Sequence, residues 1–153
     1  MKPKMKESQL LNRDDIWNAV IRALSKELHE EDPIFREPFI VFQYYSELES
    51  GGHEAWLTWM GEDISKAGIE AYLKDLTNVL KKIHADEYSA ILDTYGKKMW
   101  EKYRALEKGE TAEDDFYEVI EKADQRHYQL NGKLHELIED YFVSIHRSLI
   151  DVV

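Results

Sequence analysis

The stretch that decides the fold reads FIVFQYYSELESGGHEAWLTWMG and runs from Phe39 to Gly61. It holds a dense aromatic run, a double glycine followed by a histidine, and a second aromatic run. Pro38 fits the first turn of a helix, and apolar residues three and four apart as far as Leu48 cover a wide surface. Although the β-branched residues at its start are also typical of a buried strand, we predict a central helix over about residues 37–49.

The double glycine, Gly51-Gly52, is expected to end this helix and reverse the chain, because glycine adopts positive φ without a steric penalty. Residues 54–60 then form a short helix whose large apolar side chains, Trp56 and Leu57 among them, face inward. Residues 61–63 are predicted as the next break. These features together indicate an apolar helix, a glycine reversal and a tryptophan-rich short helix that locks the core.

Further helices are predicted on both sides of this centre from apolar residues at helical spacing. The expected helices are residues 14–30, 65–83 and 86–107. The last third forms either one bent helix or two, with Asn131-Gly132 as the interruption. Residues 111–114 resemble a capping box at the start of that last third.

The fold class that follows is all-α, a single compact domain of five to seven helices around one core. A chain of 153 residues fits one domain. Residues 12–153 are predicted to form this domain, and residues 1–11 are predicted to be a flexible lead-in.

Composition excludes several classes of function. The chain has no cysteine, which excludes disulfides and cysteine-based sites. Its net charge of -11 repels nucleic acid and anionic membranes, so we expect no direct nucleic-acid binding and no membrane binding. No apolar window approaches the roughly 18 residues of a membrane span. We expect a cytoplasmic protein.

The acidic residues gather in two clusters, and each is a candidate surface for a protein partner. Between residues 110 and 124 seven carboxylates stand against Lys122 alone. Like charges three and four apart on a helix repel one another by a few tenths of a kcal/mol per pair, so such clusters are either a solvated face or a working surface. The candidate partner-binding residues are Glu27, Glu30, Glu31, Asp32, Glu110, Glu113, Asp114, Asp115, Glu118, Glu121 and Asp124.

No catalytic residue, metal site or cofactor is predicted. Ser50-Gly51-Gly52-His53 lacks the strand-turn-helix context of a nucleophile elbow. His53 has two interpretations: its ring holds the glycine turn by packing or hydrogen bonding, or it acts as an acid-base group in a cleft. His135 lies near Glu136 and Glu139, but the other histidines are not at the spacing of a helical metal pair.

A helix, a Gly-Gly pair and an aromatic-rich short helix, in that order, resemble the DNA mimic protein 19-like domain family. The matching motif residues are Ser50, Gly51, Gly52, His53, Trp56 and Leu57, to which we assign a structural role. An aspartate-rich loop, an aromatic residue and a long final helix with a tyrosine near its end look similar too, and here they are Asp114, Asp115, Phe116, Tyr128, Leu134, Ile138 and Tyr141. The resemblance covers roughly residues 35–145.

The resemblance implies an all-helical fold and is compatible with a homodimer. For the family's founding member it also implies an acidic surface that occupies the DNA site of a transcription factor. We therefore expect a small acidic protein that acts by protein–protein contact, with mimicry of DNA charge toward a basic DNA-binding partner as its specific form. The alternatives are a non-mimic adaptor or immunity-type binding protein, and a hydrolase-like enzyme centred on His53.

Overall fold

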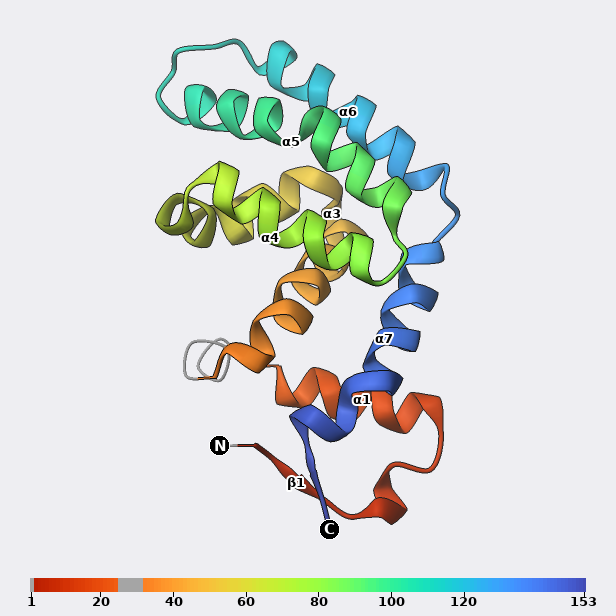
Figure 1. The fold of residues 1–153 in the computed structure, drawn as a ribbon. Helices are drawn as coiled ribbons and strands as arrows, with labels where there is room; N and C mark the ends of the chain where they lie inside the picture. The colour runs from red at the N-terminus through yellow and green to blue at the C-terminus, as the bar shows by residue number, and fades with distance from the viewer. Residues whose placement is uncertain (1, 25–31) are drawn as a thin grey trace.

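The computed structural model describes residues 2–24 and 32–153, and in them six α-helices form one compact body (Figure 1). In chain order the elements are β1 (Lys4–Met5), the 3-10 helix η1 (Glu7–Gln9), α1 (Arg13–Ala23), the 3-10 helix η2 (Pro33–Phe35), α3 (Arg36–Ala67), α4 (Ile69–Lys82), α5 (Asp86–Glu107), α6 (Glu113–Tyr128), α7 (Lys133–Leu149) and β2 (Asp151–Val152). The predicted all-α class and single domain are confirmed.

Helices α3 to α6 pack in chain order: α4 contacts α3 and α5, and α6 lies along α5 (Figure 1). The first and last helices of the described chain, α1 and α7, also pack against each other. The last third is two helices, because Gly132 adopts a left-handed conformation with φ 73° immediately before α7. Of the two alternatives left open for this region, one bent helix or two helices, the second is therefore correct, and Asn131-Gly132 forms the turn between them.

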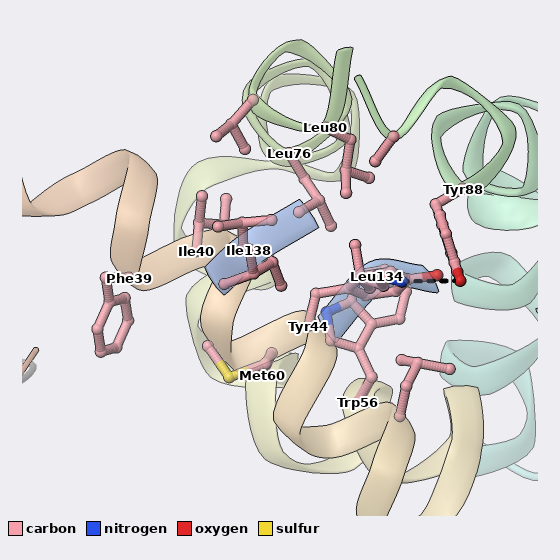
Figure 2. Close-up of a cluster of buried hydrophobic side chains, with 14 of the residues drawn as sticks. Phe39, Ile40, Tyr44, Trp56, Met60, Leu76, Leu80, Tyr88, Leu134 and Ile138 are labelled. Carbon is pink, nitrogen blue, oxygen red and sulfur yellow. Dashed lines mark hydrogen bonds between the residues drawn. The ribbon is translucent and has the colours of Figure 1, made fainter. Parts of the chain in front are cut away.

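The aromatic centre lies within a core to which the other helices also contribute. Figure 2 shows Tyr44, Trp56 and Met60 of α3 gathered with apolar side chains of α4 and α7 such as Leu76 and Ile138. Tyr44 and Trp56 are fully buried. Burying a large side chain of this kind stabilises the fold by roughly 1.5–3 kcal/mol, so the two halves of α3 contribute much of the stability.

The predicted break at the double glycine is confirmed, although both helix halves come closer to it than the predicted bounds of about 49 and 54. Within α3, Gly51 (φ -165°, ψ 27°) and Gly52 (φ 70°, ψ -163°) leave the helical conformation, so two helix halves meet there at a kink. The conformation of Gly52 lies in a region that is essentially restricted to glycine. Two residues suffice for the bend, so no loop separates the halves and the second half starts at once.

Three other predicted boundaries are wrong. The break expected at residues 61–63 lies instead at Gly68, where φ is 88°, because Gly61 stays helical beside the rings of α5. Helix α1 ends at Ala23 rather than Glu30, since Leu24 is extended. The capping box is absent: Ala112 is the N-cap of α6, and no side chain caps it.

The two ends of the described chain meet. Strand β1 pairs in parallel with β2, with Lys4 opposite Asp151, and the backbone N–H of Val153 donates to the carbonyl of Met5 at 2.9 Å. The separation of residues 1–11 from the domain stays a prediction. Within the described residues, no helix combines the length and apolarity that crossing a bilayer requires.

Candidate functional site: the acidic face of helix α6 and its attachment to helix α3

The cluster predicted between residues 110 and 124 lies on and just before α6. Six of its carboxylates are exposed, and we call them the acidic face: Glu110, Glu113, Asp114, Asp115, Glu118 and Glu121. On the opposite side of the helix, Phe116, Val119, Ile120 and Ala123 are buried. The first half of the helix therefore presents carboxylates to solvent while its apolar stripe holds it to the core.

Little positive charge compensates the acidic face. Among the described residues only Glu118 of these six forms an ion pair, with Lys122 Nζ at 3.3 Å. Three of the carboxylates stand in the first turn, where the partial positive charge of a helix N-terminus favours them by roughly 0.3–1 kcal/mol each. Glu118 and Glu121 lie beyond that turn; Glu118 has Lys122 four residues on, whereas neither the helix N-terminus nor an ion pair among the described residues accounts for Glu121.

Of the second predicted cluster, only Asp32 lies in the described residues, so its role as a partner surface stays a prediction. Glu27, Glu30 and Glu31 lie outside the described residues. Asp32 caps η2, since its side chain accepts a hydrogen bond from the backbone N–H of Ile34 at 3.1 Å. Its carboxylate therefore has a local structural role.

Asp124 is the one member of the first cluster that is turned toward the core. Its Oδ1 accepts two hydrogen bonds from His53, from the backbone N–H at 2.9 Å and from Nδ1 at 2.7 Å. The helix half that starts after the kink has backbone N–H groups without intrahelical partners. Asp124 therefore caps this half from α6, and its side chain is only 20% exposed.

Tyr44 completes the arrangement, which we call the His53 clip: Tyr44, His53 and Asp124. An ionised carboxylate can only accept hydrogen bonds, so we assign the hydrogen of the His53 ring to Nδ1. Nε2 then accepts from the Tyr44 hydroxyl at 2.7 Å. Burial, followed by the charge of Asp124 and the nearby Tyr88, raises the pKa of Tyr44 well above its ordinary value, so the hydroxyl keeps its proton.

A second histidine lies against the clip. The ring centroids of His127 and His53 are 6.0 Å apart, and Tyr88 packs on His127 at 5.2 Å. Nδ1 of His127 is buried and has no hydrogen-bond partner among the described residues. Burial, and next the proximity of His53, lowers the pKa of His127 from 6.5 to about 4, although Asp124 opposes this shift. His127 is therefore neutral at pH 7.

The order Asp124–His53–Tyr44 has the form of an acid-base relay, yet its surroundings favour a structural role. The side chain of His53 is 0% exposed, and both ring nitrogens are engaged within the protein. A general base must reach a proton on the substrate, directly or through one water. No such path leads to this ring.

The described residues contain no group of three or more His, Asp or Glu side chains arranged to hold a metal ion. His135 instead pairs with Glu139 at 3.5 Å and contacts the Tyr45 hydroxyl through Nδ1 at 2.8 Å. Its neighbourhood is thus a network of side chains at the junction of α1, α3 and α7.

The family motif lies at the kink. Gly52, His53, Trp56 and Leu57 are buried, whereas Ser50 and Gly51 are exposed. The buried members position the second half of α3 in the core, as expected of a structural motif. The sequence reasoning missed that Asp124 and Tyr44 are the partners of His53. One signal was available for Asp124: it sits at the edge of the apolar stripe of α6, next to Ala123 and four residues after Ile120.

Another link between the same two helices lies at the surface. The hydroxyl of Tyr117 on α6 donates to Glu54 Oε1 on α3 at 2.9 Å. Glu54 follows His53 directly, so both polar links from α6 reach the first turn after the kink. The motif predicted to be structural and the surface predicted to be functional are therefore joined in space.

A scan against protein-family models matches one model, described as DMP19-like protein, to residues 29–146 of this chain. No curated protein and no solved structure matches the chain. The matched region contains the kink of α3, the His53 clip and the whole of α6.

Proposed function

Because the chain belongs to the DMP19-like protein family, we propose that it acts by protein–protein contact and that the acidic face of α6 docks on a basic surface of a partner. The resemblance predicted from Ser50 to Leu57 is confirmed by this membership. The proposed partner is a DNA-binding protein, whose basic surface normally meets phosphates. A role as a non-mimic adaptor is the alternative.

The observation that carries the proposal is the exposed carboxylate surface of α6, in which only Glu118 has an ion-pair partner among the described residues. Asp114, Glu118 and Glu121, which we call the carboxylate row, are four and three residues apart and so follow one side of the helix. Duplex DNA presents about one charge per 1.7 Å of axis. A rigid helix with carboxylates along one side offers a basic partner an ordered row of negative charges, the same sign of charge that duplex DNA presents.

Burial of the apolar stripe supports the rigidity that this role requires. Phe116 and Ala123 are at most 1% exposed, so rotation of α6 about its axis would expose apolar surface. The carboxylates are therefore held in a fixed direction relative to the core. An enzymatic role has no comparable support, because the ring of His53 is closed to solvent. A homodimer stays a prediction.

The test uses two immobilised variants with the same net charge. The first neutralises the carboxylate row (Asp114→Asn, Glu118→Gln, Glu121→Gln), and the second neutralises three exposed carboxylates on other helices (Asp14→Asn, Asp93→Asn, Glu136→Gln). Each is compared with the wild-type protein for retention of basic proteins from a lysate at about 50 and 200 mM salt.

We expect the row variant to bind a retained basic protein about 10-fold or more weakly, since several exposed ion pairs of 0.2–1 kcal/mol each are lost. The control variant should bind as the wild type does, and retention should fall steeply as salt rises. Equal retention by the row variant and the control variant would reject the acidic face as the contact surface.

A further inference from the structure

One inward-facing carboxylate forms the buried polar link between α6 and α3. Asp124 receives both His53 hydrogen bonds on Oδ1, at 2.7 and 2.9 Å. Its Oδ2 lies 2.6 Å from the position that a Cβ would take at Gly52. The carboxylate therefore fills the space left by the missing side chain of Gly52. Its position is fixed by His53 at Oδ1 and by Gly52 at Oδ2.

The kink and the carboxylate depend on each other. Gly52 adopts φ 70° and ψ -163°, a conformation essentially restricted to glycine, and the next residue, His53, begins the second helix half with its backbone N–H directed to Asp124. Asp124 accepts from that N–H. Without this acceptor, the start of the second helix half would hold a poorly solvated N–H group, and such groups are destabilising when buried.

Asp124 also has a fixed relation to the acidic face. It follows Glu121 by three residues and Tyr117 by seven, so it lies at the border between the buried stripe and the exposed carboxylates. Tyr117, the other polar link, is partly exposed. Its hydroxyl donates a hydrogen bond to the carboxylate of Glu54, which is partly exposed too. The buried link through Asp124 is therefore the one shielded from competition with water.

We propose that Asp124 is a positioning residue. By accepting the hydrogen bonds of His53 at the kink, it sets the direction in which α6 presents the carboxylate row, although it does not itself touch the partner. This inference rests on the proposed function for its biological meaning. The positioning role itself concerns only how α3 and α6 lie relative to each other, so it can be measured without a partner.

The distance experiment uses the absence of cysteine from the chain. Spin labels are attached to Glu62→Cys on α3 and Gln125→Cys on α6, which are exposed positions outside the clip, and the distance distribution is recorded by pulsed electron resonance. Asp124→Ala removes the acceptor. Asp124→Asn loses the same charge but keeps an oxygen that can accept both hydrogen bonds. Asp124→Glu keeps the charge but adds a methylene where Oδ2 already meets Gly52.

We expect Asp124→Asn to keep the narrow wild-type distribution, and Asp124→Ala and Asp124→Glu to shift or broaden it. Thermal unfolding followed by circular dichroism verifies that each labelled variant is folded. If Asp124→Ala does not fold, Asp124→Glu and Asp124→Asn still give the comparison. Wild-type distances in the folded Ala and Glu variants would overturn the proposal.

Binding of a decaarginine peptide gives the second readout. Asp124→Ala and Asp124→Asn have equal charge, so a difference between them reports geometry. We expect the peptide to bind Asp124→Ala about two- to fivefold more weakly than Asp124→Asn, as for the loss of one or two exposed ion pairs. Equal affinities would overturn the link to binding. If instead the row variant of the previous section binds its protein partner as the wild type does while the distances shift as expected, the proposed function fails and the positioning role of Asp124 stands.

Discussion

Replacing Gly52 with alanine tests the kink at its most constrained point. The backbone conformation there, φ 70° and ψ -163°, costs a residue with a side chain about 1–3 kcal/mol. The added Cβ would also lie 2.6 Å from Asp124 Oδ2 and 3.0 Å from Oδ1. The carboxylate has to move, and its hydrogen bonds to His53 are lost or lengthened, at a further cost of about 1–3 kcal/mol. We therefore expect a loss of about 3–4 kcal/mol of stability.

Urea unfolding, followed by circular dichroism, measures this loss. Gly132→Ala is the matched control, because φ there is 73° while a Cβ would meet no atom within 4 Å. It should cost about 1–2 kcal/mol, the penalty of a left-handed conformation alone. Because ψ is -163° at Gly52 and 14° at Gly132, the difference between the two variants contains the collision with Asp124 together with any excess in backbone penalty at Gly52.

A double-mutant cycle sharpens the comparison. In the Asp124→Ala background the carboxylate is gone, so Gly52→Ala should cost only its backbone penalty. The coupling energy between Gly52 and Asp124 is then about 1–3 kcal/mol, within the range for residues in contact. A coupling near zero, or equal costs for Gly52→Ala and Gly132→Ala, would refute the interdependence of kink and carboxylate.

Two further predictions concern the core beside the clip. The depressed pKa of His127 means that the unfolded chain binds a proton more readily between pH 6.5 and about 4, so stability falls as the pH drops through this window. The full shift corresponds to roughly 3 kcal/mol, and screening at the solvent edge of the ring reduces it to about 1–2 kcal/mol; His127→Phe should flatten this part of the stability–pH curve, and an unchanged slope would contradict the account. Tyr88→Phe should cost about 1–3 kcal/mol by chemical denaturation, because the Tyr88 hydroxyl accepts the buried N–H of Leu134 at 3.0 Å (dashed in Figure 2). Tyr128→Phe, at an exposed tyrosine, should change stability by less than about 0.5 kcal/mol, and similar effects of the two tyrosine changes would count against the hydrogen bond.

Most of the helices, and the break at Gly51-Gly52, could be predicted from local patterns, whereas the partner that stabilises the break could not. Helix α4 matches its predicted apolar spacing, and α5 has the predicted bounds with Gly96 inside it. Gly51-Gly52 gave a sound reason for a break between the two halves of α3. The backbone N–H of His53, which follows the break, donates to Asp124, 71 residues further along the chain, and no local pattern identifies this partner.

The candidate site shows the same limit. The sequence places carboxylates on α6, and helical periodicity indicates that Asp114, Glu118 and Glu121 share a side. The same reasoning groups Asp124 with them by proximity in sequence, although its carboxylate binds His53. Which acidic residue turns inward depends on the position of another helix. For that reason the link between the glycine motif and the acidic face became visible only in the fold.

Under the proposed function, α6 offers a basic DNA-binding protein a substitute for DNA. The most direct measurement is competition: a basic protein retained on immobilised wild-type chain at about 50 mM salt is challenged with increasing duplex DNA. The account predicts that duplex DNA releases the partner in proportion to its affinity for that partner, and that the variant Asp114→Asn, Glu118→Gln, Glu121→Gln retains little of it from the start. A partner that stays bound in the presence of saturating duplex DNA would contradict the claim.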